Sequence, residues 1–276
     1  MKHLNNISLK NYTTLNIGGM CKHVFFPSKL DEIKYVLENY SPIILGCGSN
    51  VLINDEIEYE SAMILTSFNK ITRNGNKVIA EAGARLMDVC LFALTEGLGG
   101  LEFAYGIPGS VGGAMVMNAG AYGGEMKDVV DHVVTLNNKY SNHECQFEYR
   151  KSIFSNNHEL VIETTFNLYP KEKELIEMKM KELISKRIEK QPIDKYSAGS
   201  TFKRGSDFYA SQIINECNLK GYSVNDAKVS EKHSGFLINE NNASYKDYKK
   251  LVQEVQKKVY NEKHKELECE IKIIGE

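Results

Sequence analysis

The 276-residue sequence lacks several features that mark particular protein classes. It has no tryptophan, only five prolines, and no uncharged apolar run near the roughly 20 residues of a membrane helix. With 34 Lys and Arg residues against 36 Asp and Glu residues, the formal charge is −2, so bulk charge favours neither nucleic acid nor an anionic membrane as a partner. The start MKHLNNISLK has no apolar signal-peptide core. We therefore expect a cytoplasmic globular protein with more than one lobe.

Cysteine is present but not in a metal-binding or disulfide pattern. The six residues form no Cys-x-x-Cys pair and are scattered over the chain at Cys21, Cys47, Cys90, Cys145, Cys217 and Cys269. Paired ligands are typical of zinc sites, and disulfide frameworks are typical of small secreted domains. The pattern predicts no metal site and fits a reducing compartment.

Hydrophobic periodicity predicts a mixture of strands and helices. Strands are expected at 42–45, 62–65, 77–80, 132–136, 160–168, 235–239 and 267–274, and helices at 86–94, 171–191, 209–219 and 245–263. The helix at 171–191 is rich in charge, and its apolar positions include Leu175, Met178, Leu183 and Ile188.

The helix at 245–263 has the clearest pattern. Ser244 and Asp247 resemble a capping box at its start. One apolar stripe runs along it, formed by Tyr248, Leu251, Val252, Val255 and Val259.

Two glycine-rich segments carry the strongest functional signals. The segment 46–50, GCGSN, follows an expected strand and suits a turn that presents backbone N–H groups to a phosphate, although a plain tight turn is the simpler interpretation. It is not a dinucleotide fingerprint, because Val51 stands where the third glycine belongs and no helical pattern follows. The segment 97–124 holds ten of the 21 glycines, so we expect neither a regular helix nor a regular strand there.

Residues 106–124 of this second segment read GIPGSVGGAMVMNAGAYGG. Pro108 fixes one φ angle, and Asn118 adds an amide that both donates and accepts hydrogen bonds. Positive φ or close backbone approach is permitted at Gly109, Gly112, Gly113 and Gly120. Long irregular loops inside compact domains are usually functional, so composition favours a ligand-binding loop over one that merely packs closely. It leaves the ligand open.

The residues of 106–124 resemble the flavin-binding signature of the UDP-N-acetylenolpyruvoylglucosamine reductases, also called UDP-N-acetylmuramate dehydrogenases. Further segments match this family in the same order: 11–19 (NYTTLNIGG), 46–52, 149–154 (YRKSIF), 197–204 (SAGSTFKR), 221–233 and 270–275. Because the matches span nearly the whole chain, the sequence is identified as a member of this family by resemblance, with the features of its shorter, second subtype.

The resemblance implies an α+β fold, in which a two-subdomain FAD-binding module of the vanillyl-alcohol-oxidase (PCMH) type precedes a smaller α+β substrate-binding domain. The implied limits are 1–65 and 66–170 for the two FAD-binding subdomains and 171–276 for the C-terminal domain, with helix 171–191 as a connector. FAD would be bound tightly but not covalently by residues at Gly46, Cys47, Gly48, Ser49, Asn50, Gly109, Ser110, Gly112, Gly113, Asn118 and Ala119.

The implied reaction is the NADPH-dependent reduction of enolpyruvyl-UDP-N-acetylglucosamine to UDP-N-acetylmuramate for peptidoglycan, in a bacterial cytoplasm. In the family's pattern, Ser200 donates the proton, Arg150 clamps the substrate carboxylate and stabilises the enolate, and Glu270 contacts that carboxylate or orients the donor. Taken alone, these residues have plainer interpretations as a turn serine, a solvated arginine and a solvent-facing strand glutamate. The expected partners are small molecules, with no metal, nucleic acid or membrane, and the expected state is a monomer or weak homo-oligomer.

The chain departs from the family's common pattern at Gly205, Ser211 and Gln212, which leaves the contacts to uridine and the diphosphate open. Lys203 and Arg204 are weaker candidates for the diphosphate. Two rival functions remain, a flavin-dependent sugar or alcohol oxidase of the same superfamily and a non-catalytic nucleotide-sugar-binding protein. No evident motif for covalent flavin attachment supports the oxidase, and the intact Arg150, Ser200 and Glu270 argue against a pure binder.

Overall fold

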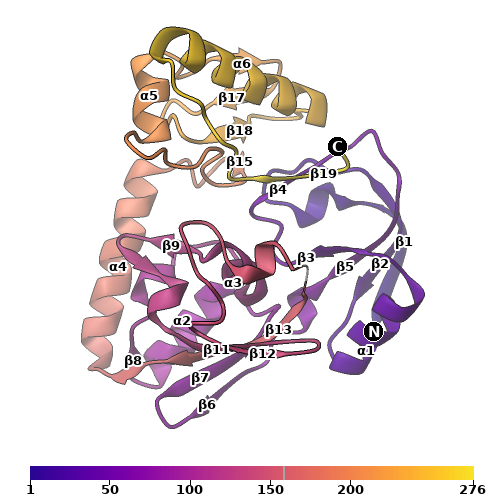
Figure 1. Ribbon diagram of the computed structural model, residues 1–276, viewed down its shortest axis with the longest axis vertical. Helices are drawn as coiled ribbons and strands as arrows, with labels where there is room; N and C mark the ends of the chain where they lie inside the picture. Colours follow the sequence, from indigo (N-terminus) through magenta and orange to yellow (C-terminus); the bar gives the residue numbers. More distant parts are fainter. Residues whose placement is uncertain (158) are drawn as a thin grey trace. The chain divides into compact units, whose positions relative to one another are not determined.

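The computed structural model describes residues 1–157 and 159–276. These residues form two units built from alternating stretches of chain: unit 1 contains Met1–Leu4, Val24–Cys47 and Ser61–Arg187, and unit 2 contains Asn5–His23, Gly48–Glu60 and Ile188–Glu276. Both units mix helices and strands, which confirms the α+β class (Figure 1). The division differs from three consecutive segments, because the first 60 residues alternate between the units. The limits predicted at 65/66 and 170/171 stay predictions.

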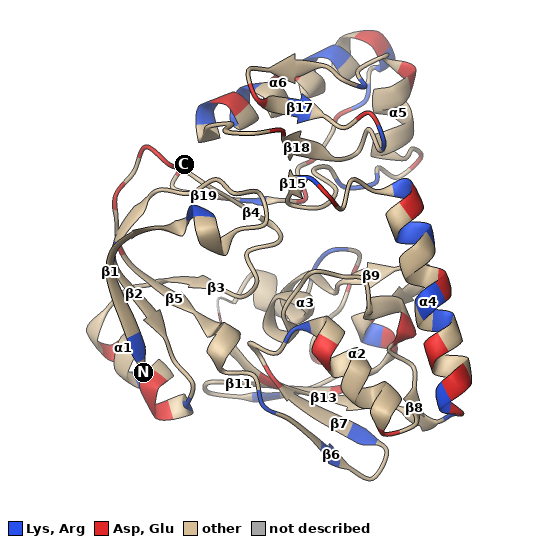
Figure 2. Ribbon diagram, turned by 180° about the vertical axis from the view of Figure 1, so that it is seen from behind, with Lys and Arg blue, Asp and Glu red and all other residues tan. Residues whose placement is uncertain are grey.

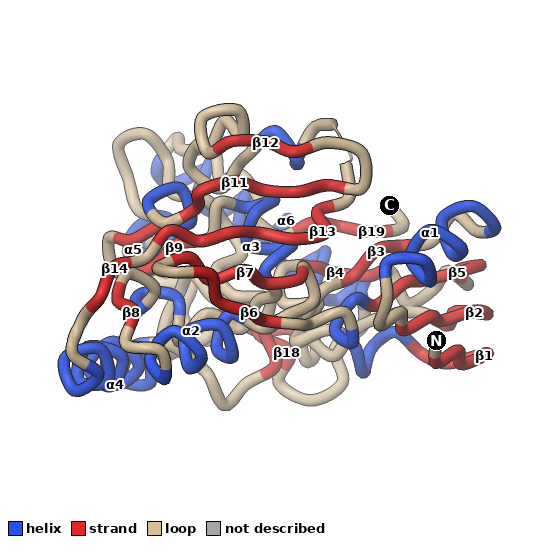
Figure 3. Tube along the Cα trace, turned by 90° about the horizontal axis from the view of Figure 1, so that it is seen from below, coloured by secondary structure: helices blue, strands red, loops and turns tan. Residues whose placement is uncertain are grey.

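A five-stranded antiparallel sheet forms the centre of unit 1 (Figure 3). The strands follow the order β12 (Lys139–Ser141), β11 (Val130–Thr135), β13 (Val161–Asn167), β7 (Lys77–Glu81) and β6 (Ile71–Asn74). Three of them confirm the strands predicted at 77–80, 132–136 and 160–168. Two short antiparallel pairs accompany the sheet, β8 (Leu98–Gly99) with β14 (Tyr169–Pro170) and β9 (Gly120–Ala121) with β10 (Gly124–Glu125).

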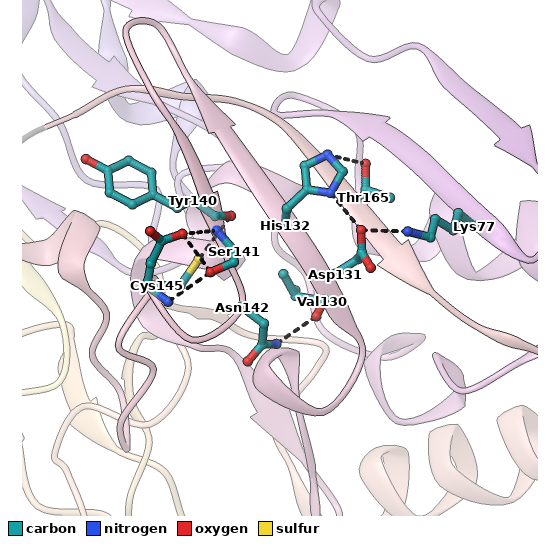
Figure 4. Close-up of polar contacts among 10 residues, drawn as sticks. Lys77, Val130, Asp131, His132, Tyr140, Ser141, Asn142, Cys145 and Thr165 are labelled. Carbon is teal, nitrogen blue, oxygen red and sulfur yellow. Dashed lines mark hydrogen bonds and ion pairs between the residues drawn. The ribbon is translucent and has the colours of Figure 1, made fainter.

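Polar side chains tie three strands of this sheet together (Figure 4). Asp131 Oδ2 accepts a hydrogen bond from Lys77 Nζ at 2.8 Å and lies 2.7 Å from His132 Nδ1. The other ring nitrogen, His132 Nε2, lies 3.2 Å from the Thr165 hydroxyl oxygen. Lys77 and then His132 hold the pKa of the Asp131 carboxyl below its usual range. Because Thr165 is buried, this chain of groups links strands and does not present a nucleophile to solvent.

Helices α2 (Leu86–Thr95) and α3 (Val111–Met117) contact strand β7, and α3 also contacts β13. The predicted helix at 86–94 is confirmed. It buries residues at helical spacing, Leu86, Val89, Cys90 and Ala93, and the chain turns at Gly97, where φ is +66°. Together with the sheet, these helices enclose the hydrophobic core of unit 1.

Helix α3 contradicts the prediction that 97–124 contains no regular helix or strand. Ser110 caps the helix, since its Oγ accepts the Gly113 N–H at 3.4 Å, and Asn118 ends it in a left-handed conformation with φ 41°. Gly112 belongs inside the helix because an added Cβ would lie only 3.1 Å from the Ala82 Cβ. Gly112 therefore allows a short helix to pack closely against Ala82. The prediction had instead interpreted the glycines as a sign of a conformationally free loop.

Helix α4 (Lys173–Lys190) confirms the charged helix predicted at 171–191, and Lys or Arg alternates with Asp or Glu along it (Figure 2). Surface ion pairs Glu177–Lys181 and Glu182–Lys186 have i,i+4 spacing. Its buried residues, Ile176, Met180 and Leu183, follow one helical stripe. Of the apolar positions noted in the sequence, only Leu183 joins that stripe, whereas Leu175, Met178 and Ile188 are exposed.

Unit 2 contains a four-stranded antiparallel sheet in the order β15 (Tyr196–Ser197), β18 (Leu237–Asn239), β17 (Ala227–Val229) and β16 (Ser223–Val224). Helix α6 (Tyr245–Lys263) contacts β16, β17 and β18, and α5 (Ala210–Glu216) contacts α6. The capping box predicted for α6 is confirmed, because Asp247 N–H donates to Ser244 Oγ at 3.1 Å and Ser244 N–H donates to the Asp247 carboxylate at 3.0 Å. The predicted apolar stripe of α6 is buried in the core of this unit.

The remaining strands bring the start of the chain into the fold. One sheet has the order β1 (Lys2–Ser8), β2 (Met20–Phe26), β5 (Tyr59–Ile64) and β3 (Ile43–Leu45), with β3 parallel to β5, and α1 (Leu30–Asn39) follows β2. In unit 2, β4 (Val51–Ile53) pairs in parallel with β19 (Lys272–Ile274). The strand predicted at 267–274 is thus shorter than expected, and before it only Cys269 forms a bridge, to Phe202.

Candidate functional site

The turn at 46–50 leaves β3 and enters β4 without an intervening helix, as the sequence predicts. Gly46 lies against Ser110, since an added Cβ would be 2.0 Å from the Ser110 Oγ. Gly48 has a φ of +62°, and its Cβ would lie 2.0 Å from the backbone oxygen of Tyr12. Burial raises the pKa of the Cys47 thiol to about 11, so this thiol stays neutral at physiological pH. Glycine is required at both positions of the turn.

Two stretches of chain, this turn and the entry to α3, have backbone donors without acceptors. Among the described residues, no acceptor receives the N–H groups of 47–50, nor those of Gly109 and Ser110. Runs of such N–H groups form concavities that bind anions. The donors of each stretch fit the phosphate oxygens of a dinucleotide such as FAD.

Asn118 and Ala119 are engaged within the protein. Asn118 is fully buried, and its Nδ2 donates to the Glu125 carboxylate at 3.0 Å and to the Glu148 backbone oxygen at 2.9 Å. Its Oδ1 accepts the Lys127 N–H at 3.0 Å, so the amide is satisfied by its neighbours. Ala119 N–H donates to the Ala114 backbone oxygen. Contacts from these two residues to a flavin stay a prediction, and Asn118 anchors the segment that follows α3.

Arg150 lies at the tip of a tight hairpin in unit 1. Glu148 and Lys151 exchange backbone hydrogen bonds of 3.0 and 3.3 Å, which places Tyr149 and Arg150 in the turn. The φ of Arg150 is +56°, a left-handed conformation that costs a side-chain-bearing residue about 1–2 kcal/mol. Its guanidinium donates to the Gly120 backbone oxygen at 3.3 Å and lies 5.1 Å from the centre of the Tyr149 ring. An unfavourable backbone conformation at a fixed arginine suggests a functional position.

Ser200 and Glu270 lie on neighbouring stretches of unit 2. Glu270 N–H donates to the Thr201 backbone oxygen at 2.8 Å, and Lys203 N–H donates to the Glu268 backbone oxygen at 2.8 Å, so the two stretches run antiparallel. Asn50 joins them, because its Nδ2 donates to the Glu270 backbone oxygen at 3.3 Å. The fold of this unit therefore brings a predicted phosphate-loop residue beside two predicted catalytic residues.

Ser200 lies in a turn of unit 2. Ser200 follows Gly199, which has a φ of +76°, and its side chain is half-buried. Within 1–157 and 159–276, its Oγ forms no hydrogen bond. A partly desolvated hydroxyl that is not committed to the protein can donate its proton to a ligand.

Weaker candidates from the sequence have partners in unit 2. The Lys203 ammonium pairs with the exposed Glu268 carboxylate. His233 Nδ1 accepts the Gly235 N–H at 3.2 Å, its ring packs edge-on against Phe236, and burial lowers its pKa. These contacts hold His233 within the packing of unit 2.

The sequence gave no reason to single out Arg187 on α4. Its side chain runs along Gly106, where an added Cβ would lie 3.0 Å from the Arg187 Cδ. Burial lowers the pKa of its guanidinium, and Tyr122 nearby opposes that shift. No ion-pair or hydrogen-bond partner of Arg187 occurs in the part of the chain that the structure describes. A partly buried cation without a partner beside the glycine-rich segment suggests a ligand with negative charge or carbonyl oxygens.

Other kinds of site are not seen in the described residues. No three or more His, Cys, Asp or Glu side chains among them are arranged to hold a metal ion. None of the described helices has the length and apolarity needed to cross a membrane.

A substitution at Gly46 tests how tightly the turn and the start of α3 are packed. We expect Gly46→Ala to lower the free energy of unfolding by about 1–3 kcal/mol, because its Cβ would overlap the Ser110 Oγ. Moving that hydroxyl would also remove the N-cap of α3, worth about 1 kcal/mol. Urea unfolding of Gly46→Ala, Ser110→Ala and the double variant would measure this coupling. Since Ser110→Ala removes the overlapping atom, the double variant should lose less than the sum, and additive losses would contradict the proposed packing.

Comparisons with known proteins cover both halves of the chain. Residues 191–274 match the family described as the C-terminal domain of UDP-N-acetylenolpyruvoylglucosamine reductase, and residues 22–138 match the FAD binding domain family. The UDP-N-acetylenolpyruvoylglucosamine reductase of Clostridium novyi (strain NT) is 44% identical over 99% of this chain and 92% of that protein. The reductase of Caldanaerobacter subterraneus subsp. tengcongensis is 45% identical over 98% and 93%. The crystal structure of UDP-N-acetylenolpyruvylglucosamine reductase (MurB) from Thermus caldophilus is 33% identical, covers 99% of this chain and 98% of that one, and has a TM-score of 0.83.

Proposed function

The chain belongs to the family of UDP-N-acetylenolpyruvoylglucosamine reductases, and from this membership we propose that it uses NADPH to reduce enolpyruvyl-UDP-N-acetylglucosamine to UDP-N-acetylmuramate. It is an oxidoreductase with an FAD-binding domain. The backbone hydrogen bond between Glu270 and Thr201, the residue after Ser200, is the observation that supports the proposal, because this reduction needs a proton donor next to a group that orients the acid or the substrate. The cytoplasmic location and the monomeric or weakly oligomeric state stay predictions.

The residues around 46–50 and 109–113 would hold the flavin nucleotide. The N–H groups of 47–50, Gly109 and Ser110, which have no acceptor among the described residues, would supply hydrogen bonds to phosphate oxygens. FAD, when bound, supplies the hydride chemistry between NADPH and the substrate. Arg187 would add positive charge beside Gly106, where it stabilises electron-rich atoms of the ligand.

Ser200 would deliver the proton that completes the reduction. Hydride addition to the enolpyruvyl group leaves negative charge on the adjacent carbon, next to the substrate carboxylate. A hydroxyl is a weak acid in water, but this acceptor is strongly basic, so positioning matters more than matching of pKa values. The half-buried Ser200 Oγ, which is not used by its described neighbours, suits this role.

Arg150 and Glu270 would manage the charge of the substrate. The guanidinium fork of Arg150 matches a carboxylate geometrically and would stabilise the enolate as charge develops. Glu270 is half-buried, and its backbone is fixed on both sides, by its N–H to Thr201 and by its C=O from Asn50. From there its side chain would orient the substrate carboxylate or the Ser200 hydroxyl.

The visible spectrum of the purified protein under anaerobic conditions tests the proposal. We expect a flavin band that bleaches when NADPH is added and returns when enolpyruvyl-UDP-N-acetylglucosamine follows. A band that returns only on admission of air would instead identify the rival oxidase of the same superfamily. A protein without flavin, or one that binds the nucleotide sugar without turnover, would contradict the proposed reductase.

A further inference from the structure

A closed ring of three hydrogen bonds lies inside unit 2 and includes Thr201, the residue after Ser200. The Leu237 N–H donates to Thr201 Oγ1 at 3.2 Å, Thr201 Oγ1 lies 3.1 Å from the Tyr248 hydroxyl, and that hydroxyl donates to the Leu237 backbone oxygen at 3.1 Å. Thr201, Leu237 and Tyr248 are all fully buried. The ring joins the stretch after Ser200 to β18 and to helix α6.

The direction of each proton in this ring is determined by the others. The Tyr248 proton points to the Leu237 oxygen, so the Thr201 hydroxyl must donate to Tyr248 and accept from the Leu237 N–H. Every polar atom is then satisfied. Burial also raises the pKa of the Tyr248 hydroxyl, which keeps it protonated. Such a fully satisfied buried network is rigid.

The backbone of Thr201 connects the ring to the residues of the proposed chemistry. Its N–H donates to the Gly235 backbone oxygen at 2.9 Å, and its backbone oxygen accepts the Glu270 N–H at 2.8 Å. Thr201 is therefore fixed at its N–H, its carbonyl and its hydroxyl, and Ser200 is the residue immediately before it in the chain. Since the Ser200 Oγ makes no hydrogen bond of its own to a described residue, its position depends on the backbone of these neighbours.

We propose that Thr201 and Tyr248 are positioning residues that hold Ser200 and Glu270 in register for proton delivery. The inference rests on the proposed function, in which Ser200 is the proton donor. Proton transfer depends steeply on placement, and a displacement of about 1 Å can cost about 100-fold in rate. The ring supplies that placement from outside the substrate contacts, at residues that the family motif around Ser200 does not identify as catalytic.

Variants of the holoenzyme separate positioning from folding. Thr201→Val keeps the branched shape and removes the hydroxyl, Tyr248→Phe keeps the aromatic ring and removes its donor, and Thr201→Ser is the matched control that retains the hydroxyl. We expect Thr201→Val and Tyr248→Phe to slow the substrate-dependent return of flavin absorbance by about 10- to 100-fold, while bleaching by NADPH is unchanged. Thr201→Ser should restore most of the rate. Hydrogen exchange at the Glu270 amide should become faster in Thr201→Val, because its acceptor is less firmly held.

A double-variant cycle with Ser200→Ala decides whether Thr201 acts through Ser200. If it does, Thr201→Val adds little further loss once the Ser200 hydroxyl is gone. Equal fold-losses in both backgrounds would overturn the proposal, as would parallel loss of both half-reactions and of bound flavin, or an unchanged substrate rate in folded Thr201→Val. Normal turnover of Ser200→Ala by itself would refute the role of Ser200, so failure of the proposed function is distinguished from failure of this inference.

Discussion

Ser200→Ala is expected to leave the bleaching of bound flavin by NADPH unchanged and to slow the substrate-dependent recovery by about 100- to 10,000-fold, the usual contribution of a general acid. The asymmetry follows from the chemistry, since only the second half of the cycle requires a proton on the substrate. Stopped-flow absorbance under anaerobic conditions measures the two halves separately.

The structure predicts that this variant folds normally. The Ser200 Oγ forms no hydrogen bond within the described chain, and the adjoining backbone is held through Thr201, Gly235 and Glu270. Removing one half-buried oxygen should therefore have little effect on the free energy of unfolding. Any large loss of turnover then reports on chemistry.

Ser197→Ala is the matched control in the same segment. Ser197 is also half-buried, and its backbone oxygen, which alanine retains, accepts a hydrogen bond from the Thr14 hydroxyl at 2.7 Å. We expect wild-type rates in both half-reactions. Full turnover of Ser200→Ala would contradict the assignment of the proton donor, and equal losses in both variants would indicate a general disturbance of the turn.

Local patterns predicted some elements residue for residue. Helix α6 begins and ends where its sequence indicates, because a capping box, a continuous apolar stripe and a run of good helix formers all agree. The same reasoning fails at α3, where glycine content is high. Gly112 is needed there for close packing on Ala82, a contact between distant parts of the sequence that composition cannot reveal.

The candidate site was predicted through motif resemblance and not through spacing. Nothing local in the sequence indicates that Thr201 and Glu270 share a hydrogen bond, because strand pairing between distant segments depends on the whole fold. Arg187 was missed for the same reason, since its contact with Gly106 arises from the packing of α4 on the glycine-rich segment. Only the need for glycine at Gly46 and Gly48 could be predicted from the local sequence, because turns with positive φ or close backbone approach favour glycine.

Replacing Arg150 is the second change that we expect to reduce turnover strongly. Arg150→Ala should reduce turnover of the enolpyruvyl substrate by about 100- to 1,000-fold, the range seen when one donor to a developing oxyanion is removed. The loss should fall mainly on kcat, because the enolate charge exists only as the reaction proceeds, with a smaller rise in KM from the lost carboxylate contact. Arg150→Lys keeps the charge without the planar fork and should recover only part of the activity. Steady-state kinetics with saturating NADPH measure these differences, and Lys151→Ala is the control, because its ammonium lies 3.7 Å from the exposed Glu148 carboxylate.

Because Arg150 has a left-handed backbone, two variants at this position should differ in stability but not in activity. Glycine is unstrained at a φ of +56°, whereas alanine is not. The free energy of unfolding should therefore be about 1 kcal/mol higher for Arg150→Gly than for Arg150→Ala. Both variants lack the guanidinium and should be equally inactive. Urea unfolding with parallel kinetics tests the pair. If Arg150→Ala turns over normally, the arginine has no part in stabilising the enolate, and if the glycine and alanine variants are equally stable, the left-handed turn at 149–150 does not persist in solution. The combination expected here, a more stable variant without activity, would indicate that this position accepts backbone strain in order to present a guanidinium.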